Sequence, residues 1–262
     1  MIPGAPGIVY LVGAGPGDPE LMTLKARRLL GEADAVVYDY LVSPEVLAWT
    51  RPNCERLFAG KKGGHFKCAQ GDIDAMLVRL AREGKTVVRL KGGDPFIFGR
   101  GGEEAQALAA AGVPFAVVPG VTAALAAAAY AGIPLTHRAH SSVVVFLTGH
   151  EDPGKRDSSV RWEDYARLGA TLCIYMGMHN LDAIARRLQA GGLAPETPAA
   201  IVQAATTDGH HTLLATLGTL SARSAEEHLA APGLVIVGEV AALAEELAWF
   251  ETARLAGTGC DI

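Results

Sequence analysis

The sequence has few cysteines, and none of them are spaced as metal ligands. The four in the 262-residue chain are scattered and form no CxxC pair; they are Cys54, Cys68, Cys173 and Cys260. Cysteine-based metal sites need closely spaced thiolates, so this pattern disfavours such a centre. We therefore expect reduced thiols, as in a cytoplasmic protein, and no bound metal.

Positive charge is also scarce. The 23 Lys and Arg residues are outnumbered by 28 Asp and Glu residues, which gives a formal net charge of −5. Proteins that bind nucleic acid generally present an excess of Lys and Arg to the phosphates. The composition therefore disfavours a general nucleic-acid binder, and we expect no nucleic-acid partner.

Long hydrophobic runs are missing as well. The most apolar segment, residues 123–131, is shorter than the roughly 20 residues of a transmembrane helix, and Pro119 and Pro134 flank it. The N-terminus has no basic region followed by an apolar run, which a secretory signal would show. We expect a cytoplasmic protein without a membrane partner.

Short apolar runs alternate with amphipathic segments in the first half of the chain. This pattern is typical of a mainly parallel sheet that helices cover on both faces. The predicted strands are 8–12, 35–38, 86–90 and 115–118, and the predicted helices are 21–30, 72–81 and 103–111.

Pro119-Gly120 is the best candidate for a junction between domains. The sequence therefore predicts two α/β domains, residues 1–119 and 120–262. In the second, strand 212–217 is a candidate to pair antiparallel with strand 199–203. Further strands are predicted at 143–147, 171–176 and 234–237, and helices after Gly120 and at 181–188 and 240–250.

Residues 92–104 form the most informative segment of the chain. Five glycines lie within eleven residues, between an apolar strand and a helix. A tight turn needs only one or two, whereas a loop with so few side chains lets its backbone approach a ligand closely. We interpret it as a binding loop, with Asp94 and Arg100 directed at the ligand.

A second glycine-rich loop, residues 13–19, follows the first strand. Its glycines read G-x-G-x-G, and Pro16 and Pro19 delay the helix, which disfavours a dinucleotide-binding turn. Asp39 follows the second strand, at the edge where open α/β sheets place their sites. A turn or a helix cap is an equally good explanation of Asp39.

Three further segments have both a structural and a functional explanation. Lys61 and Lys62 form a basic cluster in a loop that is either solvated or ligand-binding. Thr122 begins a helix of small residues, either as an ordinary cap or close to a ligand. Met176 ends a strand, either as core filler or against a flat ring such as adenine.

These segments together resemble the uroporphyrinogen-III C-methyltransferases of the tetrapyrrole methylase superfamily. The resemblance runs from about residue 8 to about residue 250. Its most specific carriers are residues 92–104 and 132–138. The other carriers are 12–18, 38–43, 60–62, 119–122, 148–150 and 175–177.

The resemblance implies an S-adenosyl-L-methionine-dependent enzyme of two α/β domains, with the cofactor in a cleft between them. The enzyme is expected to be a homodimer that needs no metal. It would methylate uroporphyrinogen III on rings A and B, through precorrin-1 to precorrin-2, in sirohaem or cobalamin biosynthesis.

The same resemblance assigns roles to individual residues. Those implied for the cofactor are Pro16, Gly92, Gly93, Asp94, Ile97, Thr122, Ala123, Met176 and Ala205. Asp39 and Arg100 are the catalytic candidates, with Asp39 stabilising the cationic methylated pyrrole or accepting its proton. The substrate carries many carboxylates, for which we expect Lys61, Lys62, Arg100, His137 and Arg138.

Two departures from the family pattern concern this site. Ala205 stands where a glycine is common, and Tyr40 stands where an arginine or lysine is common. Alternatives within the fold are another precorrin methyltransferase, a diphthine synthase and an rRNA ribose methyltransferase. Alternatives of another class are a non-catalytic tetrapyrrole-binding protein and a nicotinamide oxidoreductase.

Overall fold

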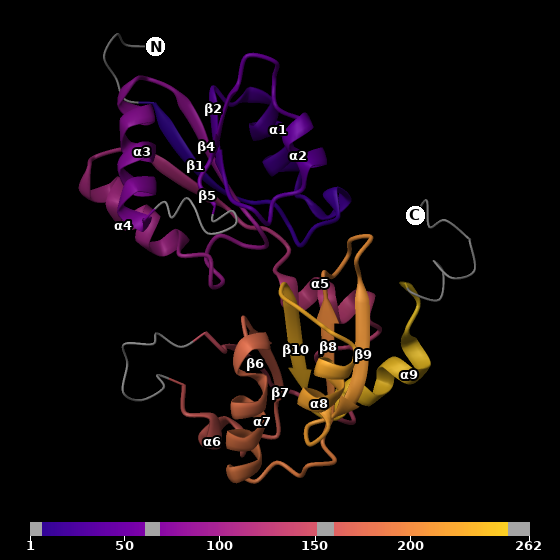
Figure 1. The fold of residues 1–262 in the computed structure, drawn as a ribbon. Helices are drawn as coiled ribbons and strands as arrows, with labels where there is room; N and C mark the ends of the chain where they lie inside the picture. The colour runs from indigo at the N-terminus through magenta and orange to yellow at the C-terminus, as the bar shows by residue number, and fades with distance from the viewer. Residues whose placement is uncertain (1–6, 61–68, 151–159, 251–262) are drawn as a thin grey trace. The chain divides into compact units, whose positions relative to one another are not determined.

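The computed structural model describes residues 7–60, 69–150 and 160–250. The chain divides into two compact units, Met1–Ala123 and Ala124–Ile262 (Figure 1). The break lies a few residues after the junction that the sequence predicts at residue 119. Each unit has its own five-stranded sheet and is described by itself.

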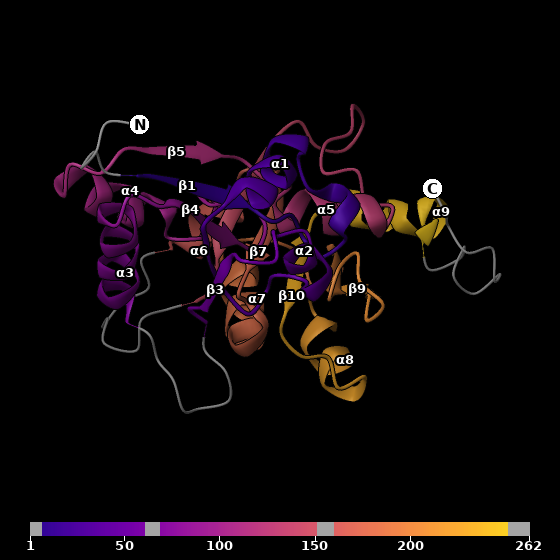
Figure 2. The same ribbon diagram turned by 90° about the horizontal axis from the view of Figure 1, so that it is seen from above.

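The first unit contains a parallel sheet in the order β3-β2-β4-β1-β5. Its strands are β1 (Ile8–Gly13), β2 (Ala35–Tyr38), β3 (Glu55–Phe58), β4 (Thr86–Lys91) and β5 (Phe115–Val118). The edge strand β5 lies beside β1 (Figure 2). The parallel sheet predicted for this half of the chain is confirmed, and β3 is an additional strand.

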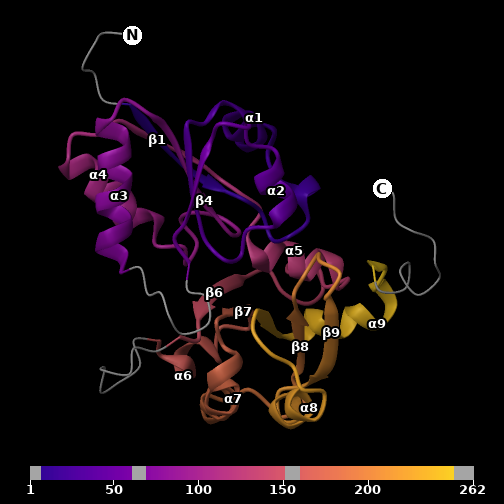
Figure 3. The same ribbon diagram turned by 45° about the horizontal axis from the view of Figure 1, so that its top comes forward.

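Successive residues of these strands supply the two faces of the sheet. Val36 and Val88 belong to the hydrophobic cluster that includes α1 and α2, whereas Val37 and Val87 belong to the one that includes α3 and α4. The two helix pairs cover opposite faces of the sheet (Figure 3). The helices of this unit are the 3-10 helix η1 (Pro19–Leu21), α1 (Leu24–Glu32), α2 (Pro44–Ala48), α3 (Gln70–Arg82) and α4 (Gly101–Ala110).

The second unit has a mixed sheet in the order β6-β7-β10-β8-β9. Strands β6 and β7 are parallel, while β10 is antiparallel to both β7 and β8. Strand β9 pairs antiparallel with β8, so the pairing suggested by the sequence is confirmed. The strands are β6 (Val144–Thr148), β7 (Thr171–Tyr175), β8 (Pro198–Gln203), β9 (His211–Thr216) and β10 (Gly233–Val237).

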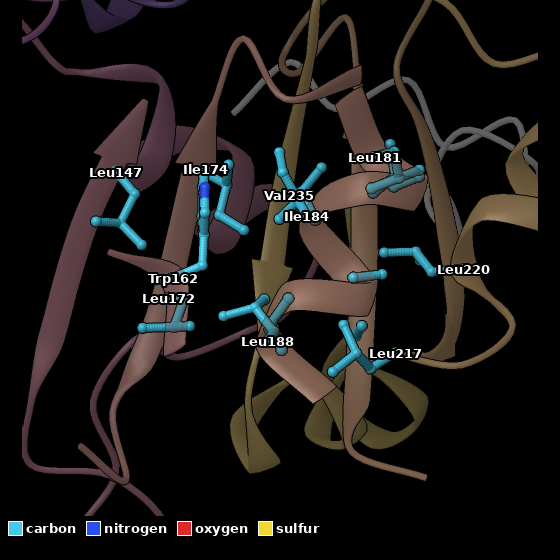
Figure 4. Packing of buried hydrophobic residues seen from close by; sticks show 14 of the residues in the cluster. Leu147, Trp162, Leu172, Ile174, Leu181, Ile184, Leu188, Leu217, Leu220 and Val235 are labelled. Atoms are coloured by element: carbon cyan, nitrogen blue, oxygen red, sulfur yellow. The ribbon is translucent and has the colours of Figure 1, made fainter. Parts of the chain in front are cut away.

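Hydrophobic clusters lie on both faces of this second sheet as well. On one face Leu181, Ile184 and Leu188 of helix α7 pack over the strands, beside the fully buried Trp162 (Figure 4). On the other face the alanines of α5 pack against Cys173 and its neighbours. The helices are α5 (Ala123–Tyr130), α6 (Trp162–Tyr165), η2 (Met178–Asn180), α7 (Leu181–Ala190), α8 (Leu220–Glu226), η3 (Glu239–Leu243) and α9 (Ala244–Leu247).

The closing helix predicted at 240–250 is confirmed only in part. The segment contains the 3-10 helix η3 followed by the short α9, and Ala248 already has an extended backbone. The Trp249 indole N–H donates to the carbonyl oxygen of Ala129 at 2.9 Å, so a tertiary contact takes the place of another helical turn. Within the described residues, no helix is both long and apolar enough to cross a membrane.

Candidate functional site

The loops that follow β1, β2, β4 and β5 contain most of the site residues predicted in the first unit. Because these strands are parallel, their carboxyl ends share one edge of the sheet. Half-buried Pro16 follows β1, Asp39 follows β2, and the glycine loop with half-buried Ile97 follows β4. The buried Thr122 follows β5. The topology therefore brings these residues to the same edge.

Three of these loops meet through their glycines. The Gly93 N–H donates to the Gly15 carbonyl oxygen at 2.6 Å, and the Gly15 N–H donates to the Gly93 carbonyl oxygen at 3.2 Å. A Cβ on Gly13 would lie 2.6 Å from the Gly120 Cα, and a Cβ on Gly120 would overlap the Gly93 carbonyl oxygen. Backbone-to-backbone packing accordingly requires glycine at these positions, whether or not a ligand is bound.

Asp94 joins two of the same loops. Its Oδ1 accepts a hydrogen bond from the Phe96 N–H at 2.8 Å, and its Oδ2 accepts one from the Gly120 N–H at 3.0 Å. The carboxylate therefore fastens the β4–α4 loop to the segment after β5. This is a structural role beside the cofactor contact that the resemblance implies for Asp94.

Gly92 has a neighbour from a different loop. A Cβ on Gly92 would lie 2.6 Å from the Leu41 Cβ, so the absence of a side chain here makes room for Leu41. Gly93 differs, because its φ of +66° favours glycine while the nearest atoms to a Cβ, on Thr122 and Ala123, lie 3.7 Å away. The two adjacent glycines are thus required for different reasons: Gly92 makes room for a neighbouring side chain, and Gly93 has a backbone conformation that favours glycine.

Arg100 lies on the surface and is paired with its own helix. Its guanidinium donates to Glu103 from Nε at 2.8 Å and from Nη2 at 2.7 Å. These hydrogen bonds raise the pKa of Arg100 and lower the pKa of Glu103. Arg100 has the left-handed φ of 59°, and α4 starts at the next residue, Gly101, rather than at Glu103 as predicted. A substrate carboxylate would have to compete with Glu103 for this guanidinium.

Asp39 forms a turn and also faces a cation. Its Oδ1 accepts a hydrogen bond from the Leu41 N–H at 3.1 Å, which is the turn that the sequence left open as an alternative. Its Oδ2 lies 4.0 Å from Nη2 of Arg89, and the side chain is 21% exposed. The carboxylate is therefore held by one hydrogen bond, lies near a cation and remains accessible at the carboxyl edge of the sheet.

Beneath Asp39 lies a buried ionic cluster that the sequence analysis did not identify. The Glu104 Oε1 accepts from Arg89 Nε and from Lys91 Nζ, both at 2.9 Å, and all three side chains are at most 4% exposed. Burial, followed by the charge of Arg89, lowers the pKa of Lys91. The signal was the alternation of charged and apolar residues at 88–91, which places both cations on one face of β4.

The second unit contributes Met176, Ala205 and two exposed basic candidates. Met176 follows β7 with φ 55° and is 48% exposed, which is unusual for core filler. Ala205 lies between two residues of positive φ and packs against the α5 cluster. His137 and Arg138 are exposed in a turn, where the His137 Nδ1 accepts a hydrogen bond from the Ala139 N–H at 3.2 Å.

The remaining predicted residues lie at a junction or outside the described ranges. Ala123 is the first residue of α5, and the next N–H, that of Ala124, donates to the Tyr175 hydroxyl at 3.0 Å. This bond fixes the start of α5 against the end of β7. Lys61 and Lys62 lie outside the described residues.

A glycine-lined edge of a parallel sheet, with accessible polar groups, is typical of a small-molecule-binding α/β protein. Comparison with known families narrows this class: the Tetrapyrrole (Corrin/Porphyrin) Methylases match residues 8–221. The chain belongs to this family. The resemblance inferred from the sequence motifs and the expected α/β fold are thereby confirmed.

Solved structures of similar proteins support the same family assignment. A uroporphyrin-III C-methyl transferase from Thermus thermophilus, complexed with S-adenyl homocysteine, is 43% identical with a TM-score of 0.76. The match covers 89% of this chain and 93% of that one. A cobalt precorrin-4 methyltransferase is 28% identical with a TM-score of 0.80, over 89% of this chain and 95% of that one.

Curated relatives are longer proteins. A siroheme synthase from Stutzerimonas stutzeri is 54% identical over 98% of this chain and 55% of its own length. One from Nitrosospira multiformis is 55% identical over 94% of this chain and 52% of its own length. The chain therefore spans about half the length of the curated relatives it matches.

Proposed function

We propose that this protein is an S-adenosyl-L-methionine-dependent uroporphyrinogen-III C-methyltransferase. It methylates uroporphyrinogen III on rings A and B and forms precorrin-2 through precorrin-1. The observation that carries this proposal is the 43% identity, over 93% of its length, to the uroporphyrin-III C-methyl transferase that binds S-adenyl homocysteine. The cobalt precorrin-4 enzyme is more distant in sequence, at 28% identity.

The residues of each unit fit such a cofactor. In the first unit, Gly92 and Gly93 are half-buried and have no side chains, so a ligand could approach the loop after β4 closely. In the second unit, the half-exposed Met176 offers an apolar surface to a flat ring. The other proposed cofactor-binding residues are Pro16, Asp94, Ile97, Thr122, Ala123 and Ala205.

When bound, the cofactor supplies an activated methyl group. The protein's own task is to orient the pyrrole carbon and exclude water, so that catalysis comes mainly from positioning. The methylated pyrrole becomes cationic and must lose a proton. Asp39 is the proposed proton acceptor, because its carboxylate is accessible and one of its oxygens is fixed by a hydrogen bond.

The negatively charged substrate requires local positive charge in an acidic protein. The proposed residues are Lys61, Arg100, His137 and Arg138, with Lys62 beside Lys61. The Arg100 guanidinium can make a two-point contact with a carboxylate, since it already binds Glu103 in that way. Exchange of Glu103 for a substrate carboxylate conserves both hydrogen bonds.

Further proposals concern the location of the protein, its oligomeric state and the pathway that it serves. We propose a cytoplasmic homodimer that feeds sirohaem or cobalamin synthesis. The siroheme synthases that match the chain support the sirohaem branch. Size-exclusion chromatography with light scattering would test the dimer, since a monomeric mass at micromolar concentration contradicts it.

The decisive test is anaerobic incubation with uroporphyrinogen III and methyl-labelled S-adenosyl-L-methionine, followed by mass spectrometry of the tetrapyrrole. A gain of two labelled methyl groups is expected. A gain of one would indicate that the second methylation is impaired, with Ala205 and Tyr40 as the first residues to examine. If S-adenosylhomocysteine binds but no methyl is transferred, the proposed substrate is wrong.

A further inference from the structure

The loop between β8 and β9 has an unusual backbone. Two of its residues that are not glycine have a left-handed conformation, Ala204 with φ 44° and Thr206 with φ 67°. Positive φ is uncommon outside glycine, and for a β-branched residue such as threonine it is a clear outlier. Antiparallel neighbours can be joined by a turn of two residues, whereas this loop spans residues 204–210. The pairing of β8 with β9 therefore does not itself require the strained backbone.

The side chain of His210 holds the second of these residues in place. The Thr206 N–H donates to the His210 Nδ1 at 3.2 Å, and the two residues are buried, being 7% and 6% exposed. Because Nδ1 accepts, the proton of the neutral imidazole is on Nε2, from which the Thr212 Oγ1 accepts a hydrogen bond at 3.0 Å. Both ring nitrogens thus have a defined role, and the imidazole connects the strained loop to β9.

Further contacts fix the imidazole ring and the start of the loop. The Phe250 ring meets the imidazole edge to face, with centroids 4.9 Å apart. The Ala204 N–H donates to the Pro232 carbonyl oxygen at 2.9 Å, and the Ala204 carbonyl oxygen accepts from the Thr207 hydroxyl at 2.7 Å. Strained backbone persists only where its surroundings over-determine it, and such segments concentrate at functional sites.

We propose that His210 is a positioning residue, which keeps residues 204–206 in their left-handed conformation and thereby presents Ala205 to the cofactor. The proposal rests on the proposed function, in which Ala205 binds S-adenosyl-L-methionine. His210 acts through the loop rather than by touching the cofactor. Without it the buried Thr206 N–H loses its acceptor, and the loop relaxes toward conformations that bind the cofactor less well.

The direct test is to remove the acceptor from the side chain of His210. His210→Leu keeps an apolar side chain beside the Phe250 ring but cannot accept from the Thr206 N–H. Only molecules with the correct loop conformation then bind, so the apparent Kd rises by the inverse of their fraction. We expect the Kd for S-adenosylhomocysteine, measured by isothermal titration calorimetry, to rise about tenfold.

Two variants serve as matched controls. His210→Asn places an amide oxygen near the former Nδ1, so it can still accept from the Thr206 N–H, and the Kd should stay within about threefold of the wild type. His211→Leu removes the neighbouring histidine, which pairs with Glu227 at 2.9 Å, and should leave the Kd unchanged. If His210→Leu does not fold, Thr212→Val removes only the acceptor of Nε2–H, and its Kd should rise at least about threefold.

Two further measurements separate positioning of the loop from a general loss of stability. Hydrogen exchange of the Thr206 amide in the ligand-free protein should be about tenfold faster in His210→Leu, because its hydrogen bond is lost. The KM for S-adenosyl-L-methionine should rise with the Kd, while kcat at saturating cofactor stays within about twofold of the wild type.

An unchanged Kd in folded His210→Leu would overturn the proposal even if the Thr206 amide exchanges faster, because His210 would then have a structural role only. Equal rises in His210→Leu and His210→Asn would also overturn it, because the acceptor atom would not matter. A wild type that does not bind S-adenosylhomocysteine would instead refute the proposed cofactor and with it the role of Ala205. The exchange rates would still show whether His210 holds the loop.

Discussion

Gly120 packs against Gly93 so closely that a Cβ on Gly120 would overlap the Gly93 carbonyl oxygen. Gly93 is at the same time bonded to Gly15 through both its backbone N–H and C=O groups. The loops after β1, β4 and β5 are therefore in direct backbone contact. This contact positions the loop from which Asp94 and Arg100 extend.

Gly120→Ala should destabilise the protein by about 1–3 kcal/mol, because neither backbone can move away without breaking hydrogen bonds. Gly102→Ala is the matched control. A Cβ on Gly102 meets no atom within 4 Å and lies in helix α4, so this change should stabilise by about 0.5–1 kcal/mol. Urea unfolding measures both, and equal effects would contradict the packing argument.

Asp94→Asn tests whether Asp94 braces the loops. The Asn oxygen can still accept from the Phe96 N–H, but its NH2 group would face the Gly120 N–H, donor against donor. We expect a loss of about 1–3 kcal/mol in the free energy of unfolding without any ligand. The surface change Asp182→Asn, which removes an exposed pair with Arg186, should cost less than about 1 kcal/mol.

Cofactor affinity separates the two roles of Asp94. A Kd for S-adenosylhomocysteine that rises while unfolding is unchanged would assign Asp94 to direct contact with the cofactor. Reduced stability together with a modest change in Kd would assign it to loop bracing. Isothermal titration calorimetry on the folded variant provides the Kd.

Asp39→Asn should lower kcat by about 10²–10⁴-fold, the usual range for loss of a positioned proton acceptor. The Asn oxygen can keep the turn bond to the Leu41 N–H, so the loop itself should remain in place. Cofactor binding is therefore expected to stay within about twofold of the wild type. Full turnover in this variant would exclude Asp39 as the proton acceptor.

The strands that the sequence predicted share a simple property. Residues 8–12, 35–38 and 115–118 are apolar because helices cover both faces of the sheet, and such runs are visible without a structure. Strand β3 was missed because its sequence is not an apolar run. Its residues are mostly exposed, so Glu55 and Arg56 break the apolar signal.

Local capping could also have been predicted more fully. Helix α2 begins at Pro44 after Ser43, whose Oγ accepts from the Glu45 N–H at 3.2 Å. A serine followed by proline is a recognised start of a helix. The end of the second unit was less predictable, because the Trp249–Ala129 contact joins residues that are distant in the sequence.

In the candidate site too, features set by the local sequence were predicted, whereas features set by contacts between distant residues were missed. The glycine loop and Asp39 were found from spacing and from their place after a strand. The Arg89–Glu104 pair was missed because Arg89 lies inside a strand that was predicted as buried and apolar, and nothing local indicates its partner on α4. Only the packing of α4 onto the sheet reveals why these charges can be buried.

Cys173 should be almost unreactive in the folded protein. Burial raises its pKa to about 12, so at pH 8 only about one thiol in 10,000 is ionised. A variant with serine at the other three cysteine positions should react with an aromatic disulfide reagent only when denaturant is added. The matched variant that retains only the half-buried Cys54 should react faster without denaturant.

Arg100→Ala should raise the KM for uroporphyrinogen III by about tenfold and leave the Kd for S-adenosylhomocysteine within about twofold, if Arg100 binds a substrate carboxylate. Stability should change little, because the pair with Glu103 is more than half exposed on both sides. Arg28→Ala is the control, since Arg28 forms a similar exposed pair with Glu32 and should alter neither constant. A larger effect on the cofactor Kd than on the substrate KM would assign Arg100 to the cofactor side instead.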